Sequence, residues 1–148
     1  MAGDPIASPQ LSPLASYEGR IAGRNVVEGP RRKPDYASIP SCVYTVPEFA
    51  TVGLTEAAAA DEGLKVEVRT SDMSTWLSSR TYAETMAWAK ILVDPASDRM
   101  VGHSGQELIN FFALSMKHGI AAKQMRDMVY AYPTFAADIT SMSRPPKY

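Results

Sequence analysis

The stretch that decides the fold of this chain is Val129-Tyr-Ala-Tyr-Pro-Thr-Phe-Ala-Ala-Asp138. Thr134 comes directly before a short run that can form a helix, so we expect its side chain to cap a short final helix. Tyr132 stands immediately before Pro133. The reference pKa of a tyrosine is about 10, so at neutral pH its hydroxyl is a protonated hydrogen-bond donor. The meaning of the stretch depends on the segments that precede it.

The composition is that of an ordinary globular protein, with 45% hydrophobic and 21% charged residues over 148 positions. A net charge of −1 gives no electrostatic attraction for nucleic acid or an anionic membrane. No stretch approaches the roughly 20 apolar residues that cross a bilayer, and the N-terminus does not resemble a signal peptide. We therefore expect a cytoplasmic protein that binds neither nucleic acid nor membrane.

Thiol and imidazole chemistry is restricted. Cys42 is the only cysteine, which excludes an internal disulfide, a redox Cys-x-x-Cys pair and a cysteine zinc site. We expect Cys42 to be a small buried thiol at the start of a strand. His103 and His118 lack a carboxylate partner at helical spacing, and we expect structural roles, with His118 stabilising the end of a helix. No metal site is predicted.

The N-terminal part of the chain predicts one helix over residues 12–28. Ser12 is the expected N-cap, Pro13 fits the first turn, and Gly29 offers a left-handed cap at the end. Residues 29–40 are rich in proline and arginine, which is typical of a linker.

Beyond residue 40 the pattern indicates strands first and helices later. The expected strands cover 41–46, 64–69, 86–93 and 99–103, and the expected helices cover 55–62, 106–118 and 121–130. In the strand over 64–69 we expect three apolar side chains to face the core: Leu64, Val66 and Val68. In the last helix we expect three to be buried: Met125, Met128 and Val129. This order argues for an α+β fold with an antiparallel sheet.

Several short segments resemble, in the same order, the C-terminal third of the pyridine nucleotide–disulfide oxidoreductases, the flavoprotein family of glutathione reductase, dihydrolipoamide dehydrogenase and mercuric reductase. The matching segments are Ala2-Gly3-Asp4, Leu11-Ser-Pro-Leu-Ala15, Val46-Pro-Glu-Phe-Ala-Thr-Val-Gly-Leu-Thr-Glu56, Gln106-Glu-Leu-Ile-Asn110 and Tyr132-Pro-Thr134. The resemblance implies that family's dimerisation-domain fold, an antiparallel β-sheet with helices packed on one side, preceded by one helix from the flavin domain. It covers essentially the whole chain.

The same resemblance implies three parts of the chain. Residues 1–30 would be the C-terminal tail of an FAD-binding domain, residues 31–40 a linker, and residues 41–148 the dimerisation domain.

The resemblance also implies cofactor contacts, which would form only in an intact parent protein. Asp4 matches the family's aspartate that hydrogen-bonds the ribityl chain of FAD. Leu11 and Ser12 match the start of the helix that lies beside the flavin's pyrimidine edge. The positive end of a helix dipole favours the charge of a reduced flavin at that place.

In the family, a His-Pro-Thr-x-x-Glu segment supplies a His–Glu acid/base pair to the partner subunit's thiols. Here Tyr132 has the His position and Ala137 the Glu position, so Tyr132 is the candidate catalytic residue. Its hydroxyl could donate to a thiolate, a substrate oxygen or a metal-bound group, or its ring could pack at a dimer interface with its hydroxyl satisfied. Asp138 is rotated by about 100° from the Glu position on a helix, so we do not expect it to replace the Glu.

The chain contains no Gly-x-Gly-x-x-Gly loop and no Cys-x4-Cys pair, which the family carries in its N-terminal regions. We therefore predict a C-terminal piece that forms a homodimer and presents Tyr132-Pro133-Thr134 to the partner subunit's active site. Its other partners would be the missing FAD- and NAD(P)-binding domains. FAD and NAD(P)H belong to the intact parent, and we expect this chain alone to bind neither and to show no reductase turnover.

Two alternatives stay open for function. The intact parent could be a glutathione reductase-like oxidoreductase with a tyrosine in place of the catalytic histidine, or the chain could be a non-redox homodimeric binding module. The strand over 99–103 is also shorter than in the family, so either the hairpin is short or residues are missing there.

Overall fold

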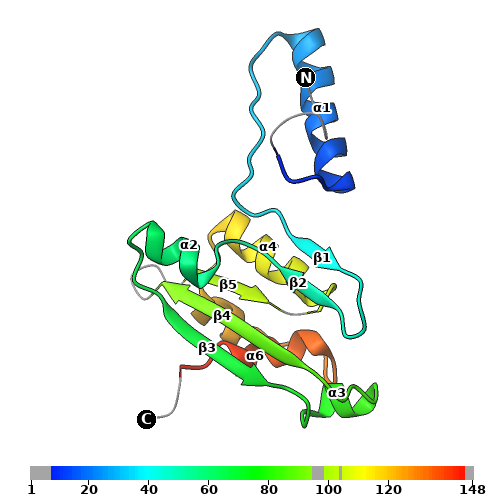
Figure 1. Cartoon of the computed structure of the whole chain (residues 1–148), viewed down its shortest axis with the longest axis vertical. Coiled ribbons are helices and arrows are strands. Elements are labelled where there is room, and N and C mark those ends of the chain that lie inside the picture. The colour runs from blue at the N-terminus through cyan, green and yellow to red at the C-terminus, as the bar shows by residue number, and fades with distance from the viewer. Residues whose placement is uncertain (1–7, 95–98, 104, 146–148) are drawn as a thin grey trace. The chain divides into compact units, whose positions relative to one another are not determined.

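The computed structural model describes residues 8–94, 99–103 and 105–145, with the backbone alone for residues 99–103. The chain separates into two compact units, Met1–Ile39 and Pro40–Tyr148 (Figure 1). Asp4, the predicted flavin contact, lies outside the described residues.

The first unit contains the predicted helix, α1 (Ser12–Glu28). The predicted Ser12 cap is wrong, because Leu11 occupies the cap position and no described side chain caps the helix. The carbonyl of Leu11 accepts from the amide of Ala15 at 2.9 Å, so the helical bonds begin one residue earlier than predicted. Gly29 ends the helix with φ 86° and ψ 165°, an extended conformation that only glycine adopts readily and not the left-handed cap that was predicted.

The segment that follows α1 folds back along it within the first unit. The Asp35 amide donates to the Tyr17 hydroxyl and the Tyr36 hydroxyl donates to Glu18, both at 3.0 Å. Glu18 is buried, so its carboxylate needs such a donor.

The second unit is built on an antiparallel sheet of five described strands in the order β1-β2-β5-β4-β3. The strands are β1 (Ser41–Val43), β2 (Phe49–Thr51), β3 (Glu67–Asp72), β4 (Trp88–Asp94) and β5 (Arg99–His103). The longest strand, β4, pairs with β3 from Trp88 to Val93 and with β5 from Lys90 to Asp94. The predicted antiparallel hairpin between β4 and β5 is confirmed, while β2 was not predicted and β1 is shorter than expected.

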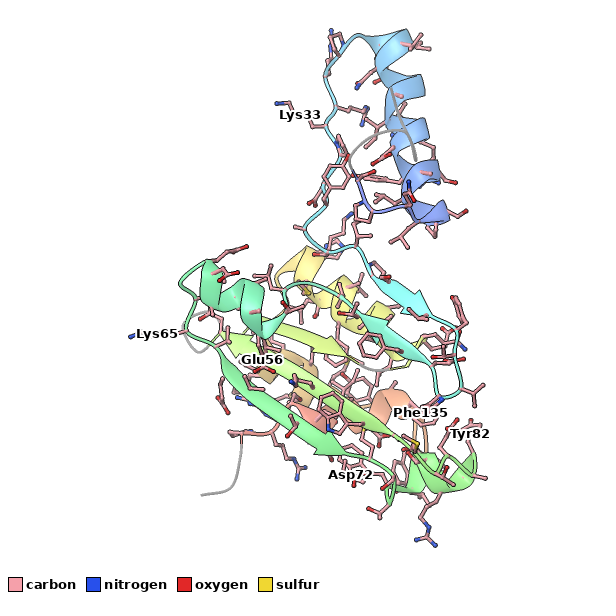
Figure 2. The ribbon with its side chains drawn as sticks, viewed as in Figure 1. Lys33, Glu56, Lys65, Asp72, Tyr82 and Phe135 are labelled. Carbon is pink, nitrogen blue, oxygen red and sulfur yellow. The ribbon has the colours of Figure 1, made fainter. Side chains whose placement is uncertain are left out.

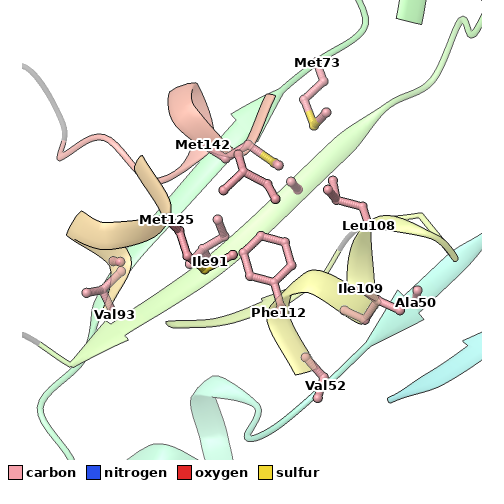
Figure 3. Close-up of a cluster of buried hydrophobic side chains, with 13 residues drawn as sticks. Ala50, Val52, Met73, Ile91, Val93, Leu108, Ile109, Phe112, Met125 and Met142 are labelled. Carbon is pink, nitrogen blue, oxygen red and sulfur yellow. The ribbon is translucent and has the colours of Figure 1, made fainter. Parts of the chain in front are cut away.

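The helices of this unit are α2 (Glu56–Asp61), α3 (Leu77–Thr81), α4 (Leu108–His118), α5 (Ala122–Asp127), the 3-10 helix η1 (Phe135–Asp138) and α6 (Ile139–Met142). Side chains of α4, α5 and α6 form one core with the sheet, and Phe112 is fully buried in it. Figure 3 shows Phe112 beside Ile91 and Met125. The predicted α+β fold with an antiparallel sheet is confirmed, and the helices that form the core, α4, α5 and α6, lie on one side of the sheet.

The opposite face of the sheet is only partly covered. Glu56 of the short helix α2 pairs with Lys90, which points away from the buried Ile91 on β4. On the same face Val68 is 40% exposed and Trp88 is 52% exposed. This leaves an apolar stretch of sheet open to solvent in the single chain.

The predicted orientation of the strand over 64–69 is wrong. Observed β3 starts at Glu67, and Val68 lies on the exposed side while the side chain of Arg69 is only 9% exposed. Arg69 forms an ion pair with Glu67 at 2.9 Å and donates to the carbonyl of Ser143 at the end of α6. Those charge-assisted bonds turn the polar side of the strand toward the helices.

The predicted helix over 121–130 ends early. Met128 has an extended backbone, with φ −71° and ψ 147°, so α5 stops at Asp127. Met125 is buried as expected, but Met128 is 51% and Val129 is 93% exposed, against the prediction. The chain there leaves the core and enters a loop.

Candidate functional site: the Tyr132 loop

The loop that leaves α5 spans residues 128–134, and we refer to it as the Tyr132 loop. Val129 is 93% exposed and Tyr132 is 72% exposed, so these two side chains point away from the core. The bond between Tyr132 and Pro133 is cis. Among the described residues, the Tyr132 hydroxyl has no hydrogen-bond partner within the chain. It is available to another molecule.

Both ends of the loop are held by hydrogen bonds. Tyr130 donates its hydroxyl to the carbonyl of Met125 at 2.9 Å, and burial raises the pKa of Tyr130. Thr134 donates to the Ala131 carbonyl at 2.7 Å and accepts from the Ala137 amide at 3.2 Å. The predicted role of Thr134 as helix cap is confirmed. The same hydroxyl also closes the loop around Tyr132 and Pro133.

Helix α3 lies against the base of the loop. The Ser78 hydroxyl donates to the carboxylate of Asp138, and the Tyr82 ring stacks on the Phe135 ring with centroids 5.3 Å apart and planes at 23°. Figure 2 shows Tyr82 and Phe135 next to each other at one end of the second unit. Sequence reasoning missed Ser78 and Tyr82, because no local pattern links either residue to its distant partner; Ser78 and Asp138 are 60 positions apart.

The arrangement does not reproduce a His–Glu acid/base pair. Ala137 has no ionisable group, and Asp138 accepts a hydrogen bond from Ser78. Burial raises the pKa of Asp138, while the hydrogen bond from Ser78 lowers it. What the loop offers chemically is an exposed phenol on a braced backbone.

The other predicted residues give no second chemical site. Cys42 is half-buried in β1, and burial, followed by the charges of Glu48 and Glu107, raises the pKa of its thiol, which disfavours the reactive thiolate. His118 lies in the last turn of α4, and the side chain of His103 is outside the described part. Within residues 8–94 and 105–145, no group of three or more His, Cys, Asp or Glu side chains could hold a metal ion.

The two described residues of the predicted flavin contact lie together in the first unit. Leu11 is half-buried in the cap position of α1, and Ser12 is exposed at the first helical position. Because no described side chain caps this end, its first amide groups remain available to an acceptor.

None of the described helices is long and apolar enough to span a membrane.

Comparison with known proteins agrees with this architecture. The sequence model of the family described as pyridine nucleotide-disulphide oxidoreductase, dimerisation domain, matches residues 39–143. The chain belongs to this family. The match covers the second unit almost completely, so the sheet, the helices and the Tyr132 loop are those of a dimerisation domain.

Relatives of two different lengths are similar to the chain. An uncharacterized 19.7 kDa protein in a mercuric resistance operon of Staphylococcus aureus is 36% identical, with 95% of this chain and 82% of that protein covered. Dihydrolipoyl dehydrogenase from Bacillus subtilis is 31% identical, with 89% of this chain but 29% of the enzyme covered. The chain thus spans most of the first relative and less than a third of the second.

A solved structure gives the same result in three dimensions. The Cu(II) complex of the HOCl-induced flavoprotein disulfide reductase RclA from Escherichia coli superimposes with a TM-score of 0.85 at 25% identity. The superposition covers 96% of this chain and 34% of that reductase. The fold of the chain is similar to that of about a third of this flavoprotein disulfide reductase.

Proposed function

We propose that the chain self-associates into a homodimer and that its Tyr132 loop is presented to the partner subunit. The observation that carries the proposal is the conformation of the loop. Thr134 donates to the carbonyl of Ala131, and Ser78 of α3 donates to Asp138 at the base of the loop, while Tyr132 is 72% exposed. A large apolar side chain held in water by a braced backbone is typical of a surface that binds another molecule.

The rest of the second unit supports self-association. Exposed large apolar residues recur on several of its elements: Val43, Tyr44, Val46, Phe49, Val68, Leu77, Tyr82, Met86, Trp88, Phe111, Leu114, Met128, Val129 and Tyr132. Stable homodimers bury on the order of 1,600 Å² or more, with an apolar centre. A unit with this much exposed apolar surface fits such an interface better than it fits an isolated monomer.

A photo-crosslinker placed at Tyr132 tests the presentation of the loop. Benzoylphenylalanine at position 132 should give a covalent dimer on irradiation of the full chain. The matched control is the same group at Lys65, an exposed position at the opposite end of the unit from Phe135 in Figure 2. Equal yields at the two positions, or no dimer at position 132, would contradict the proposal.

A second candidate function is favoured by the longer relatives, of which the chain covers only 29% and 34%. In that case the domain serves an intact oxidoreductase that binds FAD and NAD(P)H. Leu11, Ser12 and the uncapped start of α1 would lie beside the flavin, whose ring would supply the electron transfer. Of the S. aureus relative, in contrast, 82% is covered.

The absorption spectrum of the purified chain separates these two roles. A self-associating domain without a flavin site has no visible absorption, whereas flavin bands that co-purify in stoichiometric amount would overturn the view that this chain alone binds no cofactor. A dimer without flavin also fits a non-redox binding module. That reading would be excluded if addition of separately expressed FAD- and NAD(P)-binding domains produced disulfide reductase activity.

A further inference from the structure

We propose that Ser78 and Asp138 are a positioning pair that fixes the Tyr132 loop in the conformation presented to a second copy of the chain. The inference rests on the proposed self-association and adds to it the device that sets the geometry of the loop. The pair is not catalytic, since neither residue is expected to touch a substrate or cofactor.

The bond joins two elements that have little stability of their own. Helix α3 has 5 residues and η1 has 4, and isolated helices of such length do not persist in water. Ser78 is only 3% exposed, so an unpaired hydroxyl there would cost free energy, and Asp138 accepts its hydrogen bond. A hydrogen bond to a carboxylate in a half-buried place is stronger than one between neutral groups.

Tyr82 directly follows α3, and its ring stacks on the ring of Phe135 as a second contact. Phe135 begins η1 and Asp138 ends it, so α3 and the residue after it hold η1 at both ends. Two contacts at the two ends of one helical turn fix its rotation as well as its position.

The position of η1 is transmitted to the loop through Thr134. Its side chain accepts from Ala137 inside η1 and donates to the carbonyl of Ala131, the residue before Tyr132. The chain of bonds therefore runs from Ser78 through Asp138, η1 and Thr134 to the backbone next to Tyr132. Loss of the bond between Ser78 and Asp138 should therefore weaken the bond between Thr134 and the carbonyl of Ala131.

Ser79 provides a matched control on the same helix. It is fully buried, and its hydroxyl has no hydrogen-bond partner among the described residues. Replacing Ser79 by alanine removes the same atom from a neighbouring position without breaking a bond. The comparison between the two serines isolates the effect of the bond to Asp138.

The experiment is hydrogen–deuterium exchange of the full chain, followed by mass spectrometry, with the dimer dissociation constant measured on the same samples. In Ser78→Ala, amide exchange in residues 129–138 should rise about tenfold and the dimer should weaken by a similar factor, as for loss of one charge-assisted bond. Peptides from β4 and α4 should exchange as in the wild type. Ser79→Ala should change neither quantity.

Two variants of Asp138 test the same bond from its acceptor side. Asp138→Ala should behave like Ser78→Ala, and it replaces that variant if Ser78→Ala does not fold. Asp138→Asn keeps an oxygen that can accept from Ser78 and should restore slow exchange in the loop.

Four results would contradict the positioning pair or the self-association on which it rests. If Ser78→Ala and Asp138→Ala leave the exchange of residues 129–138 unchanged, or if Ser79→Ala raises it equally, the positioning pair is refuted. If the wild type is monomeric at every concentration, the proposed self-association fails, whatever the exchange shows. Faster exchange of residues 129–138 with an unchanged dimer dissociation constant would also overturn the inference. The bond between Ser78 and Asp138 would then stabilise a loop that does not contact the second copy.

Discussion

Two tyrosines of the Tyr132 loop differ by two positions and have opposite surroundings. Tyr130 is half-buried and donates its hydroxyl to the carbonyl of Met125, while Tyr132 is 72% exposed and has no described partner. One hydroxyl therefore belongs to the fold, and the other is free for recognition.

Replacing each tyrosine by phenylalanine should separate these roles. Tyr130→Phe should lower the free energy of unfolding by about 0.5–1.5 kcal/mol, because a buried carbonyl loses its donor. Tyr132→Phe should change it by less than about 0.5 kcal/mol, since the hydroxyl faces solvent. Urea denaturation of both variants measures the difference. A larger loss for Tyr132→Phe would mean that its hydroxyl has a partner inside the folded chain.

Asp138 gives the chain a pH dependence of known sign. Its pKa is raised in the folded state, mainly by burial. The carboxyl therefore contributes stability that is fully present below its unfolded pKa of about 3.9 and is lost as the pH rises through the folded pKa. Compared with Asp138→Asn, which does not titrate, the wild type should lose free energy of unfolding as the pH rises above about 4. A relative gain over that range would show that the Ser78 bond outweighs burial.

Some residues of the site follow from local sequence and others do not. The cap at Thr134 was predicted, because a threonine before a short helical run satisfies its first amides wherever it occurs. Asp138 was not expected to replace the missing Glu, because one residue on a helix rotates a side chain by about 100°. Its partner Ser78 could not be predicted, since the contact depends on how α3 folds against η1.

At the scale of elements, two helix ends of the second unit are set by single residues. Thr55 caps α2 by accepting from the Ala58 amide at 3.1 Å, and Gly119 ends α4 with φ 65° and ψ 30°. Both ends follow from residue type alone, because capping and left-handed glycine are local effects.

Gly119 can be tested against another glycine of the same segment. An alanine methyl group would meet nothing within 4 Å at Gly119 or at Gly105, but only Gly119 has a positive φ. Gly119→Ala should therefore lower the free energy of unfolding by about 1 kcal/mol, and Gly105→Ala should lower it little or not at all. Thermal or urea unfolding gives the comparison, and equal losses would exclude the left-handed backbone as the cause.

Strand β3 shows where prediction from pattern fails. Alternation of Leu64, Val66 and Val68 predicted a core-facing apolar side, yet Val68 is 40% exposed and Arg69 faces the helices. Periodicity shows that a strand has two different faces, but it does not show which face the helices cover. In a dimerisation domain both faces can be buried, one by the chain itself and the other by a second molecule, so an apolar side can remain open in the single chain.

At the scale of the whole molecule, the fold follows from the order of short motifs, and the family match over residues 39–143 agrees with it. The arrangement of the exposed surface could not be read from the sequence in the same way. Val129 and Met128 were predicted to be buried and are instead among the exposed apolar residues around the loop. If a second chain covers these side chains, they are buried in the dimer although they are exposed in the single chain.

Sedimentation velocity of the purified full chain tests that claim most directly. The chain has a mass of 16.1 kDa. With rising concentration we predict a shift to a species of twice that mass, and Tyr132→Ala should move the shift to higher concentration without loss of secondary structure. A single species of 16.1 kDa at all concentrations would contradict the account.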